Sequence, residues 1–363
     1  MNMNFGIMRL IRGNPVLEVL LGATCGGLLV LLVRWSQGAW MPSGEPTYSS
    51  RIEDTLTPTL EKFTWQAQFP LPLDRESSQV FPFLLNHPDK CKVSGGVPFL
   101  VMLVMTQPQD QVLRDAIRYT WGNETTVPGV IIRRLFLMGL SSDFSSHHLL
   151  EEDEKHKDLL QVGFLDTYHN QTLKTLMGLE WVAQYCPMTH YVLKVNGNVF
   201  LNPHLLVQQI LKPEQQPWPD FITGCIYRNR IPIRRQSHPQ YMPLDMFSHA
   251  RYPPYCCSPG YVLSRPLALK VLSIARRMPA VHLEDVFVGL CLHQLGVEPT
   301  PSPPNTFLMF GRLYNRCDFR GFALVHPFKH QKLLQVWPDF QKGNITCPLK
   351  GRVGMETSQL DSN

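Results

Sequence analysis

Blocks of apolar and polar residues along this chain predict the strands and helices of an α/β protein. Residues 98–105 are apolar on both faces of an extended segment, which is typical of a strand in the middle of a parallel sheet. Residues 111–121 then repeat at helical spacing, with Val112, Ala116 and Tyr119 on one face and Leu113 and Ile117 beside them. This succession predicts a layered fold.

The same succession continues into the middle of the chain. Residues 133–138 predict a second strand, and residues 170–185 predict an amphipathic helix. Residues 191–202 form an apolar strand that is broken at its centre by Asn-Gly-Asn. Because ligands of such folds bind beyond the carboxyl ends of central strands, we expect this break to lie at the functional site.

The N-terminus predicts a membrane anchor. Residues 16–33 are almost continuously apolar, with Glu18 near their start, and arginines flank them. This length just spans a thin bilayer, and the poor cleavage site that follows favours a retained signal-anchor over a cleaved signal peptide. We expect a cytoplasmic tail at 1–15 and a transmembrane helix at 16–33, with the rest of the chain lumenal.

The remaining boundaries follow from composition. Residues 34–90 are rich in Pro, Ser and Thr without a sustained period, which predicts an extended lumenal stem, with a packed subdomain as the alternative. We expect the catalytic domain at 91–350 and a short tail at 351–363.

Charge excludes one class of partner. The 34 Lys and Arg residues barely exceed the 29 Asp and Glu residues, and no basic run is interleaved with aromatics, so nucleic-acid binding is not expected. The His- and Glu-rich residues 147–156 could suggest a metal site, but a solvated helix is the favoured interpretation. The sequence does not indicate an oligomeric state.

Sequons and cysteines agree with a lumenal location. Three Asn-x-Ser/Thr sequons follow the apolar span, at Asn123, Asn170 and Asn344. Apart from Cys25 in the span, eight cysteines remain, and because no Cys-x-x-Cys occurs they predict disulfides rather than zinc. They are Cys91, Cys186, Cys225, Cys256, Cys257, Cys291, Cys317 and Cys347. We expect most of them to be paired, with Cys317–Cys347 as a local bridge.

Four segments carry a family resemblance. They are residues 113–122 (LRDAIRYTWG), 164–178 (FLDTYHNQTLKTLMG), 252–264 (with YPPYC and GYVLS) and 282–289 (HLEDVFVG). In this order they resemble the β-1,3-glycosyltransferase family that includes β-1,3-galactosyltransferases and β-1,3-N-acetylglucosaminyltransferases. The resemblance covers residues 98 to about 347.

This resemblance implies a fold, a location and a reaction. The fold is GT-A, a Rossmann-like three-layer sandwich with a central mixed sheet, here preceded by one transmembrane helix. The location is the Golgi membrane, in a single-pass type II orientation. The reaction is inverting transfer from a UDP-sugar to a glycan acceptor on glycoprotein or glycolipid, usually with Mn²⁺.

Inverting transfer needs a base for the acceptor hydroxyl. In the family, the Asp of a Glu-Asp-Val motif serves as that base; it matches Asp285 here, with Glu284 beside it. The alternative is that both acids only cap the apolar helix that follows.

Two arginines are candidates for binding the donor. Arg114 and Arg118 lie a helical turn apart and could form paired hydrogen bonds with phosphate oxygens. They could instead be solvated or pair with Asp115. Trp121 is expected in the core rather than as a stacking platform.

The expected metal position departs from the family. The family pattern is Lys-Val/Thr-Asp-x-Asp, whereas this chain has Lys194 followed by Asn196 and Asn198. The resemblance places these three residues at the donor, with Asn198 and the matching His326 as weak metal ligands. Asn offers only a neutral carbonyl oxygen, so we expect Mn²⁺ affinity to fall. An Asn-Gly hairpin turn is the alternative interpretation.

Two functional hypotheses remain open. The first is an active β-1,3-glycosyltransferase with weak or no metal dependence, transferring galactose from UDP-galactose to an N-acetylhexosamine-terminated glycan. The second is a transferase fold that has lost catalysis and acts as a binding partner or chaperone. Rigid Pro259 and a second thiol, Cys257, in a segment that is usually a Gly-rich loop predict that acceptor-side loops differ from those of relatives.

Overall fold

The computed structural model describes residues 81–142, 146–215, 217–343 and 347. Within these ranges no helix is both long enough and apolar enough to cross a membrane. The predicted tail 1–15, transmembrane helix 16–33, most of the stem 34–90 and the tail 351–363 lie outside the described residues, as does Asn344.

A mixed sheet forms the centre of the described part, as expected. Its strand order is β1-β4-β3-β2-β5-β8-β7, in which β4, β3, β2 and β5 are parallel, while β1 and β8 run antiparallel to their neighbours. The strands are β1 Phe83–Leu85, β2 Leu100–Met105, β3 Ile132–Leu140, β4 Leu159–Leu165, β5 Tyr191–Asn196, β7 Ile222–Tyr227 and β8 Tyr255–Ser264.

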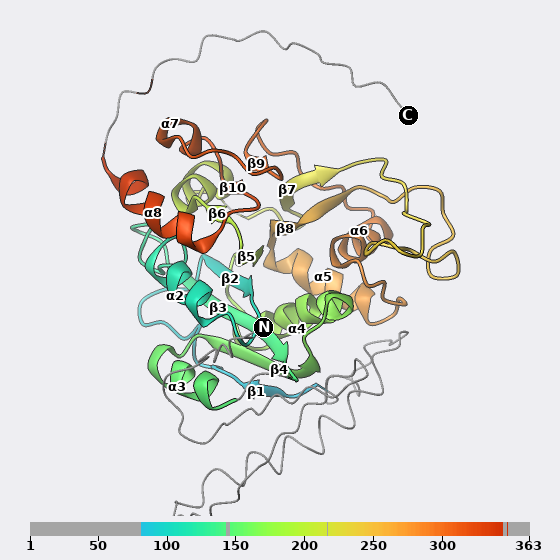
Figure 1. The fold of residues 1–363 in the computed structure, drawn as a ribbon, viewed down its shortest axis with the longest axis horizontal. Helices are drawn as coiled ribbons and strands as arrows, with labels where there is room; N and C mark the ends of the chain where they lie inside the picture. The colour runs from blue at the N-terminus through green and yellow to red at the C-terminus, as the bar shows by residue number, and fades with distance from the viewer. Residues whose placement is uncertain (1–80, 143–145, 216, 344–346, 348–363) are drawn as a thin grey trace, which may run out of the picture. The chain divides into compact units, whose positions relative to one another are not determined.

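Helices cover both faces of this sheet (Figure 1). They are α2 Gln111–Tyr119, α3 Ser146–His156, α4 Gln171–Tyr185, α5 Arg265–Ala275, α6 Glu284–Gln294, α7 Arg316–Phe319 and α8 His330–Gln341, with the short helices η2 Tyr168–Asn170 and η3 Leu205–Leu211. A small sheet joins β6 Phe200–Leu201, β10 Leu324–Val325 and β9 Phe307–Leu308.

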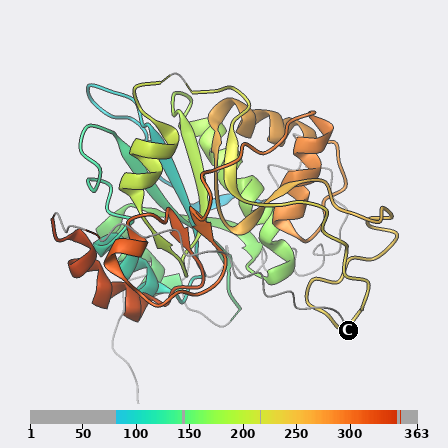
Figure 2. The ribbon, with the colours of Figure 1, turned by 90° about the horizontal axis from the view of Figure 1, so that it is seen from above.

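Two cores flank the central sheet. Side chains of α4, α5 and α6 pack on one face, and those of α2, η3, α8 and the small sheet pack on the other. Figure 2 shows the same separation, with α8 and α6 on opposite sides. Burying both faces explains why β2 is apolar along its whole length. The three-layer α/β architecture is therefore confirmed.

The apolar face expected for α2 is only partly the buried one. Val112 and Tyr119 are 66% and 67% exposed, whereas Arg114, Ala116 and Ile117 are buried. A buried arginine occupies the face that packs on the sheet, because its charge is neutralised by acidic partners elsewhere in the chain. An apolar pattern cannot reveal this arrangement.

The folded part begins before the predicted stem ends. Strand β1 pairs with β4 through Phe83 and Val162, and Phe81 is buried in the core. The last residues of the predicted stem are therefore an edge of the catalytic domain. Their pairing partner lies about 80 residues later in the chain, which local composition does not show.

The cysteine prediction is half right. Cys317–Cys347 is a disulfide as expected, with 5.6 Å between Cα atoms, and Cys91–Cys186 is a second, with 5.4 Å. The other four described cysteines are free thiols: Cys225, Cys256, Cys257 and Cys291. The expectation that most of the eight are paired is therefore wrong.

Strand order places a ligand site beside β2 and β5. From β2 the chain moves through β3 to β4 on one side, and then returns through α4 to β5 on the other side. Connections therefore diverge at the carboxyl ends of β2 and β5, where doubly wound sheets bind ligands. Met105 and Asn196, at these ends, are paired in register. The Asn-Gly-Asn break lies at this switch point.

Candidate functional site

The break after β5 is not a hairpin turn. Strand β5 pairs with β2 and β8, whereas β6 pairs with β10 in the small sheet. Gly197 donates its N–H to the carbonyl oxygen of Met105 at 3.1 Å, and a Cβ at Gly197 would lie 2.7 Å from Leu113 Cδ2. Gly197 therefore packs closely on α2, and because β5 and β6 pair with different strands, the hairpin interpretation is wrong.

The break lies next to the segment that carries His326. Phe328 donates its N–H to the carbonyl oxygen of Asn198 at 2.8 Å, and His326 donates its N–H to Leu308 at 2.9 Å. The tertiary structure thus brings together the two segments predicted to hold a metal. Burial lowers the pKa of His326 and favours its neutral form.

These donors do not fit a hard dication well. Asn196 and Asn198 are neutral amides, and Asn196 Oδ1 lies 3.3 Å from the Lys194 ammonium, which repels a cation. His326 adds one neutral nitrogen. Divalent cations of this kind prefer anionic oxygens, which residues 196–198 do not offer.

Lys194 has a structural role that the sequence did not reveal. It is 1% exposed, and its Nζ donates to Glu284 Oε2 at 2.9 Å, to the Ser258 carbonyl oxygen at 2.7 Å and to Ser258 Oγ at 3.1 Å. An ammonium has three N–H donors, so this set satisfies it. The predicted donor contact by Lys194 is replaced by this buried ion pair.

Glu284 is the other half of that pair. It is 3% exposed, its Oε1 accepts from the Tyr261 hydroxyl at 2.5 Å, and its Oε2 also accepts from Ser258 Oγ at 3.1 Å. Both carboxylate oxygens are therefore occupied by protein groups. This geometry assigns Glu284 a supporting role in place of the predicted catalytic one.

Asp285 is the carboxylate that faces open space. It begins α6 beside Glu284, and it lines a cavity of about 520 Å³. Its Oδ2 accepts from the N–H of Ser258 at 3.1 Å and its Oδ1 from the N–H of Val286 at 2.9 Å. Burial, helped by the charge of Glu284, raises the pKa of Asp285 to about 6. A carboxyl group so placed can accept a proton near neutral pH.

Tyrosines and polar side chains form the rest of this first cavity. Tyr227, Tyr252 and Tyr255 line it, and the Arg230 guanidinium lies 4.4 Å from the Tyr227 ring centre. Asn229 and Gln240 add amides. Planar rings with a few hydrogen-bonding groups are typical of pockets that hold a small organic ligand.

The long connection between β7 and β8 supplies much of this wall, and Arg234 holds it in shape. Its guanidinium donates to four carbonyl oxygens of one loop, at 2.6 to 3.1 Å. The acceptors are Met242, Pro243, Phe247 and His249. No motif signalled Arg234, and its role depends on backbone geometry alone.

Comparison with known proteins shows the family of this chain. A family model described as Galactosyltransferase matches residues 113–303, more than half of the 363 residues. Beta-1,3-galactosyltransferase 1 of Mus musculus is 34% identical over 325 residues, which are 88% of this chain and 97% of that protein. The chain belongs to the galactosyltransferase family.

Further similarities differ in how much they cover. Beta-1,3-galactosyltransferase 2 of Mus musculus is 39% identical over 271 residues, 73% of this chain. The alignment spans only 64% of the length of that relative. Among solved structures, galactosyltransferase LgtC matches 67% of the chain at 11% identity with a TM-score of 0.35. A score of this size does not decide a fold.

In this galactosyltransferase-family chain the two predicted donor arginines form ion pairs. Arg114 is fully buried and bonds to Glu152 at 2.6 Å and to the carbonyl oxygens of Gln107 and Pro108. With its donors used in this way, Arg114 has a structural role instead of the predicted one.

Arg118 also bonds to acids of the protein. It pairs with Glu152 at 2.6 Å and with Asp158 and Asp115 at 2.7 Å each, so the alternative of an Asp115 partner is confirmed. Burial opposes the charge of Arg118, but these ion pairs outweigh it and raise its pKa. The Arg118 guanidinium is therefore bound to acids of the protein instead of the predicted donor phosphates. Trp121 is fully buried, as expected.

A second buried ion pair lies at the same sheet edge and was missed. Lys174 Nζ donates to Asp166 Oδ2 at 2.7 Å and to the carbonyl oxygen of Thr106, just after β2, at 2.6 Å. Burial lowers the pKa of Lys174. Asp166 Oδ1 and Thr106 Oγ1 have no hydrogen-bond partner within the described ranges. Both residues of the pair fall in segment 164–178, which carried the resemblance without any assigned role.

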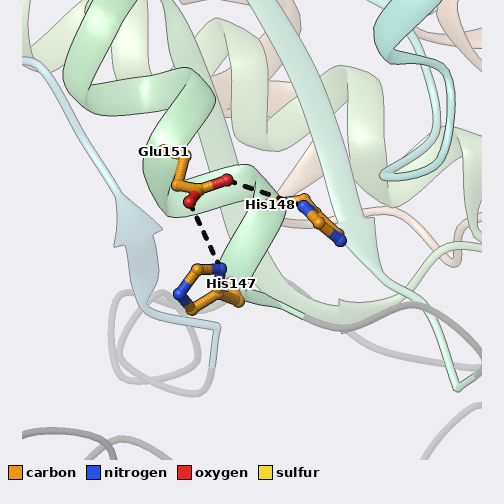
Figure 3. A group of neighbouring side chains, drawn as sticks. All are labelled: His147, His148 and Glu151. Atoms are coloured by element: carbon orange, nitrogen blue, oxygen red, sulfur yellow. Dashed lines mark ion pairs between the residues drawn. The ribbon is translucent and has the colours of Figure 1, made fainter.

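The His- and Glu-rich segment forms α3, as favoured. His147 and His148 both lie 3.6 Å from Glu151 on the exposed side of this helix (Figure 3). The helix is not fully solvated, however, because Glu152 is 3% exposed and bonds to both arginines of α2. The exposed cluster of His147, His148 and Glu151 thus lies on a different side of α3 from the buried Glu152.

One predicted glycosylation site is buried. Asn170 is 6% exposed, and its Nδ2, the atom that would carry a glycan, donates to the carbonyl oxygen of Leu165 at 2.8 Å. The fold thus engages this nitrogen in a hydrogen bond, which disfavours a glycan at Asn170; its glycosylation stays a prediction. Asn123 is exposed and stays a prediction.

Proposed function

We propose that this chain is an inverting β-1,3-glycosyltransferase that transfers galactose from UDP-galactose to an N-acetylhexosamine-terminated glycan. The observation that carries the proposal is Asp285, a carboxyl group with a pKa of about 6 that lines a cavity of about 520 Å³. Membership of the galactosyltransferase family supports the same chemistry.

The proposed step is a direct displacement. The oxygen of the acceptor hydroxyl attacks the anomeric carbon of galactose, and Asp285 takes the proton from that hydroxyl. The bond from that carbon to the diphosphate oxygen breaks, and UDP leaves with the electron pair. The buried pair Lys194–Glu284 fixes Ser258, whose N–H in turn orients the Asp285 carboxylate.

Metal independence is part of the proposal. The donor set at Asn196, Asn198 and His326 supplies no anionic oxygen, so no step is assigned to Mn²⁺ here. The nucleotide diphosphate itself is expected at the switch point, where β2 and β5 end.

The proposed location is the Golgi lumen, with the chain anchored as a type II membrane protein. The apolar residues 16–33 and the exposed sequon at Asn123 support this location, as do the two disulfides, which suit an oxidising compartment. Protease protection on sealed vesicles would test it: cleavage of the folded domain without detergent would contradict the orientation.

The deciding experiment is a UDP-release assay over a panel of UDP-sugars with an N-acetylglucosamine acceptor, with Mn²⁺ and with a chelator. We expect UDP-galactose to be turned over at similar rates in both conditions. Abolition of turnover by the chelator would contradict metal independence, and a different preferred donor would contradict the choice of galactose.

A second function is supported by one observation. The loss of both carboxylates at residues 196 and 198 favours a transferase fold that binds partners without catalysis. Its signature would be UDP or glycan binding by calorimetry with no turnover of any donor in the panel.

A further inference from the structure

A second cavity, of about 580 Å³, adjoins the first one. Consecutive residues line the two in turn: Pro239 and Tyr241 face the second, and Gln240 between them faces the first. Likewise His282 lines the second and Leu283 the first. The two cavities therefore share stretches of wall, and His282 of the second lies three residues before Asp285 of the first.

Tyr168 lies at their boundary. Its side chain lines the second cavity and is hydrogen-bonded to Gln240 of the first, and burial, together with the charge of Asp285, raises its pKa. Tyr168 is 47% exposed, so a ligand can reach it. Because the charge of Asp285 affects this hydroxyl, the Tyr168 ring lies near the proposed base.

The lining of the second cavity differs in charge from that of the first. The first contains Asp285 and Arg230, whereas none of the described residues that line the second is Asp, Glu, Lys or Arg. Its imidazoles include His169 and His282, whose ring centres lie 5.4 Å apart. Burial, together with His169, lowers the pKa of His282 and keeps it neutral.

Rings, amides and hydroxyls without formal charge suit a neutral sugar. The C–H face of a pyranose packs on aromatic rings such as Tyr168 and Tyr241, and its hydroxyls bond to amides such as Gln236. A sugar that carries a carboxylate would find no Lys or Arg partner among these lining residues.

We propose that the second cavity is a further acceptor subsite, which holds the neutral sugar next to the terminal N-acetylhexosamine. This inference rests on the proposed function, because it requires the terminal sugar to lie beside Asp285. It adds a specificity: acceptors of two or more sugars are preferred over a single N-acetylhexosamine.

The test compares two acceptors in matched variants. The acceptors are N-acetylglucosamine and a disaccharide in which N-acetylglucosamine is linked to galactose at its reducing end. His169→Trp fills the second cavity from its exposed side, and His204→Trp places the same ring on an exposed histidine beside η3. We expect the parent and His204→Trp to favour the disaccharide in kcat/KM, and His169→Trp to reduce that preference about ten-fold, mainly through KM.

A direct binding arm separates this inference from the proposed function. Calorimetry of the disaccharide is repeated on Asp285→Asn protein with UDP present, where turnover is not needed. Weaker binding in the Asp285→Asn, His169→Trp double variant than in Asp285→Asn alone supports the subsite even if no donor is turned over. Equal disaccharide preference in parent and His169→Trp, with equal binding in this arm, overturns it.

Discussion

The turn after β5 and the start of α6 are both in contact with Lys194 of strand β5, but they differ in charge. The turn has neutral Asn196 and Asn198, whereas α6 begins with two carboxylates, Glu284 and Asp285. Lys194 connects the regions, because its ammonium bonds to Glu284 and lies 3.3 Å from Asn196 Oδ1. Charge is thus concentrated where we propose that a proton is moved, and is missing where a cation was expected to bind.

This difference shows that the two tasks of such a site are physically separable. The α6 region is neutralised internally, since Lys194 balances Glu284 and leaves Asp285 to titrate. The turn carries no buried charge that needs a partner, and it is held by backbone hydrogen bonds of Gly197 to Met105 and of Phe328 to Asn198. Losing carboxylates at the turn therefore need not disturb the base.

The largest expected effect removes the base. Asp285→Asn keeps the shape and can still accept the Ser258 N–H, but it cannot take a proton, so kcat should fall by about 10³-fold. UDP affinity should be unchanged by calorimetry. Asp245→Asn, an exposed carboxylate of the β7–β8 loop, is the control and should keep full activity. Near-normal turnover in Asp285→Asn would assign the base to another group.

The next effect is on stability. Lys194→Met leaves Glu284 buried without its cation, which should lower the free energy of unfolding by about 3 to 5 kcal/mol in urea titrations. Lys270→Met breaks a half-exposed pair with Asp220 and should cost less than about 1 kcal/mol. Equal losses of unfolding free energy in the two variants would mean that the Lys194–Glu284 pair does not stabilise the fold more than an exposed pair does.

A smaller effect restores charge at the turn. The double variant Asn196→Asp, Asn198→Asp supplies two anionic oxygens, so Mn²⁺ should tighten UDP binding by about 1 to 3 kcal/mol, with little such coupling in the parent. Because a carboxylate introduced at position 196 would also attract Lys194, the single variant Asn198→Asp is a useful companion. Strong Mn²⁺ coupling in the unaltered protein would show that other groups hold the cation.

The smallest effect is the pH dependence of the unaltered enzyme. Asp285 must be ionised to accept a proton, and its pKa is raised to about 6. kcat/KM should therefore fall about ten-fold per pH unit below pH 6 and level off above it. An acidic limb near pH 4, the ordinary range of a carboxyl group, would indicate that Asp285 is not desolvated during turnover.

Several features could be predicted from the sequence because they depend on local pattern. The apolar run of β2, the helix α4 and the Glu-Asp pair at the start of α6 were all identified correctly from periodicity and resemblance. The local disulfide Cys317–Cys347 was also predicted correctly. These features need no knowledge of distant partners.

Pairings over long sequence distances decided the rest. Arg114 and Arg118 were predicted to bind the donor because they are arginines one turn apart, yet Glu152 and Asp158 neutralise them. Asn170 fits a sequon but bonds to Leu165 in the fold. A side chain's availability depends on burial and partners, which residue type and spacing do not specify.

The sequence by itself determined which residues could do chemistry, and the tertiary structure decided which are free to do it. Glu284 and Asp285 are adjacent and both acidic, so residue type alone does not separate their roles. In the fold, Lys194 and Tyr261 occupy both oxygens of Glu284, while Asp285 faces the first cavity. The physical reason is that a buried charge must be paired, and the partner that pairs it comes from a strand 90 residues away.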